Sequence, residues 1–397
     1  MAPRESASSR GAWASRRVIV AGVTAVVLAA GGTAAAIATQ HSAPASHAIS
    51  RARLAAASCQ GPEGAAYVAV AGFQAFDAVN TSNCGLVQQY NVGDREVPGT
   101  GTSDFDFDST DEGVAIHGST LYFADTGNDT VAVIDSAALQ VSNFENPAET
   151  LIPVGINPDS VAVTPNGNQV WVADTGPQTG SPSLGGISVI SAATNKVTST
   201  MKLPADPRQI AFAPDGATAY VTTSQGVYVI NTATRRVVRV IGGLGNPEGV
   251  TVSPNGEQVY VTNTDQNLVD VIGAATNRVT GTIKVGEMPW QLVLSSNGGT
   301  LYVADGDSNA ISVIATASDK VTKTISDPGD PVSLALTPDG SQLWVGGLTS
   351  GIVTVFDAAT GNLVGSFNVG FGGEANAGDG EEPTGIVITS ALTPGGK

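Results

Sequence analysis

The chain contains few of the residues on which common enzyme sites depend. Its 397 residues include two cysteines and three histidines, and only 13 % of them are charged. His117 is the one histidine beyond residue 48, so the spacing typical of a zinc site is absent. The sequence also lacks a nucleophile elbow and a glycine-rich phosphate-binding loop. These absences argue against the best-known hydrolase and nucleotide-binding classes.

Positive charge is also scarce, which bears on the choice of partner. The net charge is −17. Residues 1–48 hold four of the 18 Lys and Arg and one of the 35 Asp and Glu, so the rest of the chain has a net charge of −20. Binding to nucleic acid depends on Lys and Arg that neutralise phosphates. We therefore do not expect a nucleic-acid partner.

Residues 1–48 have the organisation of an export signal. A basic region with four arginines precedes Val18–Ile37, which is uncharged and mostly apolar, and a small-residue site follows at Ala43–Ala45. Ser15–Arg17 also resembles a twin-arginine signal. We predict export to the cell surface, the cell wall or the medium by a Sec or twin-arginine route. Residues 1–48 are then a cleaved signal peptide or a retained membrane anchor, and 49–61 a linker.

The two cysteines both follow this leader. An exported chain with a single pair favours a disulfide between Cys59 and Cys84. Closing that loop contributes roughly 3 kcal/mol. The alternative is a lipid anchor on Cys59, which follows Ala56–Ser58.

An aromatic residue followed by Val or Phe recurs along the rest of the chain. The spacings lie between 40 and 55 residues. A period near 40 built from short strands is typical of a β-propeller. The seven pairs begin at Tyr67, Tyr122, Trp171, Tyr220, Tyr260, Tyr302 and Trp344.

Each later unit contains four predicted strands. A proline opens the first strand, as in Pro158–Val163, and a turn such as Pro165–Gly167 leads to the aromatic strand. Proline presets φ in this turn and glycine accepts positive φ. A third strand and a turn such as Ala192–Asn195 precede the fourth strand. Each unit is thus one WD40-like four-stranded blade.

The two ends of the repeat region are incomplete in complementary ways. Pro383–Ile388 looks like a first strand without an aromatic strand after it, whereas Tyr67 has no proline-led strand before it. We therefore predict an all-β, seven-bladed β-propeller of four-stranded antiparallel blades, closed by pairing the N- and C-terminal strands in one blade. The propeller is expected over 62–390, with a tail at 391–397.

Val261–Asn263 after Tyr260 resembles the repeat of the YVTN-type seven-bladed β-propellers of bacterial and archaeal surface proteins. The resemblance covers about residues 62–390, although other copies differ, as at Tyr302–Asp305. It implies the fold and an exported protein. It does not imply one activity, because the family includes binding and scaffold proteins and related folds include lyases and lactonases.

The connections predict which face of the propeller binds. Expanded segments are expected only on the face where first strands begin, at 93–112, 176–186 and 370–382. The residue after each blade-opening proline lies near the central channel on that face. Trp290 and Arg208 are candidates to stack on and hydrogen-bond a polar ligand, with Glu248, Asp159 and Glu112 beside them; a solvated rim is the alternative. The ring consists of Glu112, Asp159, Arg208, Glu248, Trp290, Val332 and Thr384.

Further carboxylates have a structural and a functional interpretation. Asp125, Asp174, Asn263 and Asp305 end the aromatic strands, where such residues usually cap the following turn. Alternating Asp104, Asp106 and Asp108 could supply oxygen ligands for Ca²⁺, or form a solvated acidic loop. No other cofactor is indicated. His117 is expected on the face opposite the expansions.

We conclude from the sequence that the protein is an exported, monomeric, non-enzymatic binding or scaffold propeller. Its expected partner is a protein, a glycan or a small molecule, and it meets a membrane only through an uncleaved leader. The alternative is a metal-assisted lyase or lactonase at the same channel mouth, which would need carboxylates that converge on a cation.

Overall fold

The computed structural model describes residues 65–71, 75–80, 85–91, 113–136, 150–177, 185–347, 352–368 and 382–389. In the first three ranges, and in the last except Ile386, it describes the backbone alone. The chain divides into Met1–Arg53 and Leu54–Lys397, and all described residues belong to the second unit. The only helix within these ranges is the 3-10 turn η1 (Thr126–Asn128). The described part thus contains no helix with the length and apolarity needed to cross a membrane.

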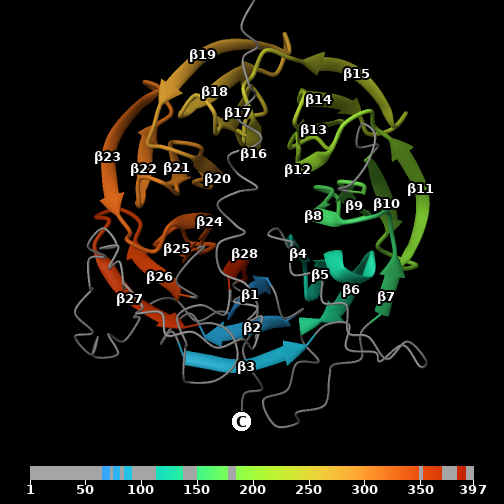
Figure 1. The fold of residues 1–397 in the computed structure, drawn as a ribbon, viewed down its shortest axis with the longest axis horizontal. Coiled ribbons are helices and arrows are strands. Elements are labelled where there is room, and N and C mark those ends of the chain that lie inside the picture. Colours follow the sequence, from blue (N-terminus) through green and yellow to red (C-terminus); the bar gives the residue numbers. More distant parts are fainter. Residues whose placement is uncertain are drawn as a thin grey trace, which may run out of the picture. The chain divides into compact units, whose positions relative to one another are not determined.

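Six blades are built from consecutive strands (Figure 1). Each is a four-stranded antiparallel sheet in which every strand pairs with the next along the chain. The first three blades are β4 (Val114–His117), β5 (Thr120–Asp125), β6 (Thr130–Asp135) and β7 (Thr150–Pro153); β8 (Pro158–Val163), β9 (Gln169–Asp174), β10 (Gly186–Ser191) and β11 (Lys196–Lys202); β12 (Pro207–Phe212), β13 (Thr218–Thr223), β14 (Gly226–Asn231) and β15 (Arg236–Ile241).

The next three blades repeat this order. They are β16 (Pro247–Val252), β17 (Gln258–Asn263), β18 (Leu268–Gly273) and β19 (Arg278–Lys284); β20 (Pro289–Leu294), β21 (Thr300–Asp305), β22 (Ala310–Ala315) and β23 (Lys320–Ser326); β24 (Pro331–Leu336), β25 (Gln342–Gly347), β26 (Ile352–Asp357) and β27 (Leu363–Asn368).

The prediction of a seven-bladed ring closed by hydrogen bonds is wrong. The described residues form a propeller of six four-stranded blades. One further sheet has the order β28-β1-β2-β3, formed by β28 (Glu382–Thr389), β1 (Ala65–Ala71), β2 (Ala75–Asn80) and β3 (Gly85–Asn91). Within it β1 pairs antiparallel with β28, Tyr67 opposite Val387. Among the described strands no ladder of hydrogen bonds runs from one sheet to the next. Side-chain packing between sheets is what joins blades into a propeller, and strand patterns alone do not reveal it.

The aromatic-Val pairs explain how neighbouring blades pack against each other. Adjacent residues of a strand point to opposite faces of its sheet. Trp171 therefore lies in one core cluster with Ala219 and Tyr228 of the following blade, whereas Val172 lies in another with Tyr122 of the preceding blade. The second strands are buried, and Trp171 is fully enclosed. The core consequently lies between the blades.

Tight turns join the first and second strands as predicted. Gly167 has a φ of 71° and donates its amide N–H to the carbonyl oxygen of Thr164 at 2.8 Å. The turn at Gly256 repeats this geometry, with a φ of 73° and the same bond to Ser253. Glycine adopts this left-handed conformation without a steric penalty, so these short turns form locally.

One connection corrects the prediction that all expansions lie on a single face. β6 ends at Asp135 and β7 begins at Thr150, so residues 136–149 separate a third strand from a fourth. The equivalent connection between β10 and β11 is only 192–195. An exposed fourth strand has no fixed apolar pattern, so its start cannot be located reliably from the sequence.

Candidate functional site

The candidate ligand-binding residues lie at the start of the inner strands. We call this side of the propeller the entry face; the second strands end on it, because Pro158 pairs with Asp174 and Pro247 with Asn263. Asp159, Arg208, Glu248 and Trp290 each follow the first residue of β8, β12, β16 or β20. Val332 has the same place in β24, and Thr384 follows Pro383 as the third residue of β28. The remaining predicted residues, Glu112, Asp104, Asp106, Asp108, Cys59 and Cys84, lie outside the described residues.

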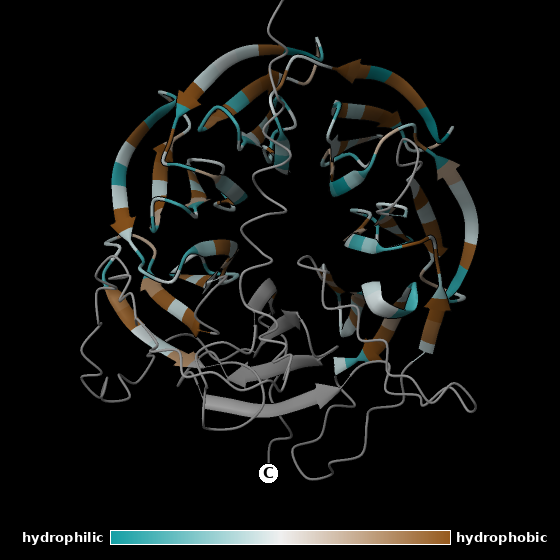
Figure 2. Ribbon diagram, viewed as in Figure 1, coloured by the Kyte–Doolittle hydropathy of each residue, from teal (hydrophilic) through white to brown (hydrophobic). Residues whose placement is uncertain are grey.

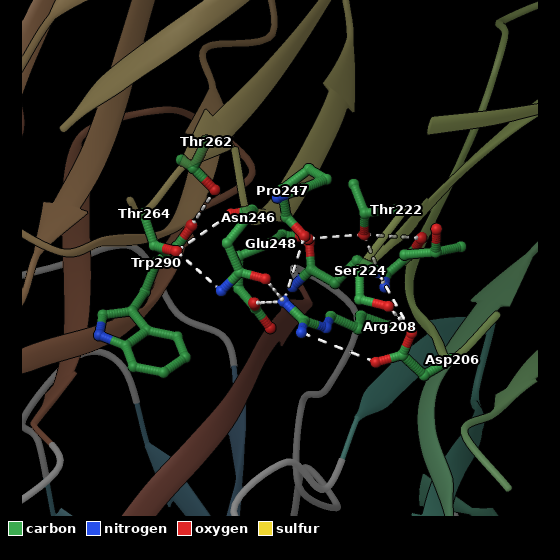
Figure 3. Close-up of polar contacts among 12 residues, drawn as sticks. Asp206, Arg208, Thr222, Ser224, Asn246, Pro247, Glu248, Thr262, Thr264 and Trp290 are labelled. Atoms are coloured by element: carbon green, nitrogen blue, oxygen red, sulfur yellow. Dashed lines mark hydrogen bonds and ion pairs between the residues drawn. The ribbon is translucent and has the colours of Figure 1, made fainter. Parts of the chain in front are cut away.

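Arg208 is the centre of a polar cluster between two blades (Figure 3). Its Nη1 forms a short ion pair with Glu248 Oε2 and donates to Asn246 Oδ1 at 2.9 Å. Its Nη2 lies 3.7 Å from Asp206 Oδ2. The side chains of Arg208 and Glu248 are 20 % and 14 % exposed, so water screens this pair only partly. The guanidinium charge is thus balanced by carboxylates of the protein itself.

Hydrogen bonds to the backbone fix the same blade junction. Thr222 Oγ1 donates to the carbonyl oxygen of Glu248 at 2.6 Å. Gln209 Oε1 accepts from the amide of Val250 at 3.2 Å. The Arg208–Glu248 pair therefore spans two blades that are already held in register. The ion pair therefore holds the neighbouring side chains of this junction in position.

Trp290 follows the first residue of β20, in the blade after the one that contains Glu248. Its carbonyl oxygen accepts from Thr262 Oγ1 at 2.6 Å, which anchors the backbone. Its indole is partly exposed and lies over Gly306, where an added Cβ would be 2.9 Å from Trp290 Nε1 and 3.0 Å from Asp330 Oδ1. Burial and the nearby Asp307 raise the pKa of Asp330. An apolar ring and a carboxylate thus approach the same glycine.

The sequence interpretation missed three residues of this region. Asp206 and Asn246 contact Arg208, and Asp330 lies beside Trp290. Each of the three directly precedes a blade-opening proline. That repeat position was a usable signal, since Asn157 occupies it as well.

The Asp and Asn residues that end the second strands hold loops in place. Asn263 caps the following turn as predicted, because its Oδ1 accepts from the amide of Gln266 at 3.2 Å. Asp125 accepts from the side-chain Nδ2 of Asn128 at 2.9 Å, and its side chain does not cap η1. Asp174 instead reaches the loop before its own blade, where the amide of Gly155 donates to Oδ1 at 3.1 Å, and Ser188 Oγ donates to Oδ2 at 2.7 Å.

Burial makes these carboxylates unusually basic. It raises the pKa of Asp174 to about 6, although hydrogen bonds from Ser188 and Gly155 oppose the rise. Burial likewise raises the pKa of Asp305 to about 6, and Ser312 Oγ donates to it at 2.5 Å. Each carboxylate is hydrogen-bonded by a serine of the third strand and by the loop that precedes the blade, so these pKa values reflect structural burial.

The opposite face contains His117. It ends β4, as predicted, and an added Cβ at Gly167 would lie 2.0 Å from its Nε2. His117 therefore packs on the neighbouring blade's tight turn. Over the described ranges, no three His, Cys, Asp or Glu side chains are grouped closely enough to hold a metal ion.

Comparison with solved structures supports the propeller fold. A functionally unknown protein from Desulfotomaculum acetoxidans is 17 % identical, with a TM-score of 0.63 over 82 % of this chain and 98 % of that one. Kuenenia stuttgartiensis hydrazine synthase is 24 % identical, with a TM-score of 0.54 over 66 % and 80 %. The Cps50 (Swd1) propeller domain of Myceliophteria thermophila is 13 % identical, with a TM-score of 0.55 over 66 % and 86 %. At such low sequence identities, these similarities show only that the folds are alike.

No curated protein matches the chain. A family model described as "Choice-of-anchor I domain" matches residues 56–312. That description suggests a surface-anchored or exported protein. Because the match covers more than half of the sequence, this β-propeller belongs to the Choice-of-anchor I domain family.

Proposed function

We propose that the protein is an exported binding scaffold of the YVTN type that holds a sugar-containing ligand on its entry face at Trp290. The observation that carries this proposal is the approach of the Trp290 indole and the Asp330 carboxylate to one glycine, Gly306. A pyranose presents a flat apolar face that stacks on an indole, and hydroxyl groups that donate to a carboxylate.

Arg208 has a supporting role in this proposal. Its guanidinium is engaged by Glu248, Asn246 and Asp206. We therefore assign Arg208 to stabilising the junction between the two blades, and not to direct contact with the ligand. This favours binding over the lyase or lactonase alternative, which would use Glu248 and Arg208 as acid-base groups that act on a substrate.

The test is binding of the full exported chain to a glycan array, followed by titration of the best glycan. Trp290→Ala is expected to raise the Kd by roughly 5- to 150-fold, equivalent to about 1–3 kcal/mol for an aromatic anchor. Ile156→Ala removes another apolar side chain, 49 % exposed, and is the matched control. Its Kd is expected to match that of the unmodified protein.

Two outcomes would contradict the proposal. Equal glycan binding by the Trp290→Ala variant would show that the ligand lies elsewhere. Hydrolysis of a simple lactone that requires added divalent cation and is lost in Glu248→Gln would support the enzymatic alternative instead.

A further inference from the structure

The outer strand β15 departs from the pattern that its neighbours share. Three other outer strands begin with a basic residue, Val and Thr, and have a second Thr two positions later: 196–200 in β11, 278–282 in β19 and 320–324 in β23. β15 reads Arg-Val-Val-Arg-Val at 236–240. Valine thus replaces threonine at both positions.

The first of these positions has a structural role in the neighbours. Each of these three outer strands has a bulge, and the bulged threonine donates its hydroxyl to a carbonyl of the third strand: Thr198 at 3.1 Å, Thr280 at 3.1 Å and Thr322 at 3.2 Å. In β15 the bulge falls at Val238, because Val229 pairs with Arg239 and Ile230 with Val237. Valine cannot make this bond.

The substitutions expose apolar surface on the rim. Val238 is 60 % exposed, the highest value among the large hydrophobic side chains of the described residues, and Val240 is 44 % exposed. The packing between blades does not require these valines, because they lie outside it. Their burial would need a second molecule.

The turn that enters β15 is also unusual. Arg235 has a φ of 55°, a left-handed conformation. The other blades place Asn195, Asn277, Asp319 or Gly361 at this point of the turn, and these residue types tolerate that conformation. Arginine has no short side chain to bond locally, so backbone strain accompanies an added positive charge.

Three arginines therefore accompany the exposed valines. Arg236 and Arg239 are exposed and Arg235 is partly exposed. None of the three forms an ion pair within the described part of the chain. In a protein with net charge −17, this short basic stretch attracts an acidic partner.

β15 also has unpaired backbone groups. It is the last strand of the order β12-β13-β14-β15, so one of its edges pairs with no described strand. It lies on the rim in Figure 1, and in Figure 2 apolar and polar bands alternate along it. Edge charges usually prevent strand pairing, but exposed valines favour it. An edge that has both features is suited to a partner strand of opposite charge.

We propose that β15 binds an extended acidic segment of a partner protein, which adds to this blade as a fifth strand. Its backbone pairs with the free edge, its Asp and Glu side chains face Arg236 and Arg239, and its β-branched residues cover Val238 and Val240. Antiparallel pairing of β15 with β15 of a second copy would bring arginines together, which disfavours self-association. A polyanion would engage the arginines and leave the valines and the backbone unused.

The experiment measures fluorescence anisotropy of labelled peptides added to the full chain. The probe has the sequence EVDVEV with blocked ends, and KVKVKV is its charge-reversed control. Binding of the acidic probe is expected, and its Kd should rise several-fold between about 20 and about 200 mM salt. The basic peptide is expected not to bind.

Variants that restore the neighbours' residues separate the contributions. Val238→Thr with Val240→Thr is expected to weaken binding of the acidic probe at least 5-fold. Arg235→Asn with Arg239→Ser is expected to weaken it at least 10-fold and to flatten the salt dependence. Both replace residues by those used in equivalent turns and strands, so the melting temperature should not fall. Val279→Thr on β19 is the matched control and should bind normally.

Three results would overturn the proposal. The first is no binding at millimolar peptide, or equal binding by the valine variant. The second is that polyglutamate binds the unmodified protein as tightly as the probe does and binds the Val238→Thr, Val240→Thr variant with the same Kd. That result would assign β15 to binding polyanions. The third is concentration-dependent dimerisation that Arg239→Ser enhances, which would assign the edge to a second copy.

Discussion

Asp174 should make the stability of this propeller depend on pH in the direction opposite to ordinary acid denaturation. The residue is 5 % exposed, and burial raises the pKa of its carboxyl from 3.8 to about 6. Between these values the folded state binds a proton that the unfolded state does not. The free energy of unfolding therefore increases as the pH falls through 6, and the contribution is complete near pH 3.8.

The size of the effect follows from the two pKa values. Lowering the pH from about 7.5 to about 5 should add about 1.4 kcal/mol to the free energy of unfolding from this group alone. Asp174→Asn removes the titration but keeps the shape, and Asn263 serves at the same repeat position in another blade. The difference in stability between the unmodified protein and this variant should thus shift by about 1.4 kcal/mol over that pH range.

Urea unfolding followed by tryptophan fluorescence at several pH values measures this difference. Ser188→Ala is the informative companion variant, because it removes a hydrogen bond that lowers the pKa of Asp174. Its pH dependence should therefore be steeper than that of the unmodified protein. If the stability difference between the unmodified protein and the Asp174→Asn variant stays constant from about pH 7.5 to about pH 5, the carboxylate is not held in a buried site and our reasoning is refuted.

Three further results are expected. Gly226→Ala should lower the free energy of unfolding by about 2–3 kcal/mol, because an added Cβ would lie 2.2 Å from a β15 carbonyl oxygen, whereas Gly118→Ala, with open space around it, should cost about 1 kcal/mol; equal losses would contradict this. Trp171→Ala should cost about 3–5 kcal/mol by thermal or urea unfolding, and a loss below about 1 kcal/mol would show that the blades do not pack on it. Mass spectrometry after alkylation without reductant should find Cys59 and Cys84 joined, and two alkylated thiols would refute the disulfide.

The local units of this fold could be predicted from the amino-acid sequence. Prolines and glycines fix the turns at Gly167 and Gly256 by their own φ preferences, independently of distant residues. The aromatic-Val pair specifies a strand buried on both faces, which Trp171 and Val172 confirm by packing on opposite neighbours. Strand order within each blade follows, because short turns can join only antiparallel neighbours.

How these units meet became clear only in three dimensions. The number of packed blades, the long connection before Thr150 and the partners of Arg208 depend on contacts between segments that are distant in sequence. The sequence placed Glu248 near Arg208 on the ring, but only the structure showed that the two side chains, forty residues apart and on different blades, form an ion pair. The exposure of Val238 and Val240 likewise follows from the position of β15 on the rim of the propeller. Backbone preferences act over a few residues, whereas burial and ion pairing are set by whatever the fold brings alongside.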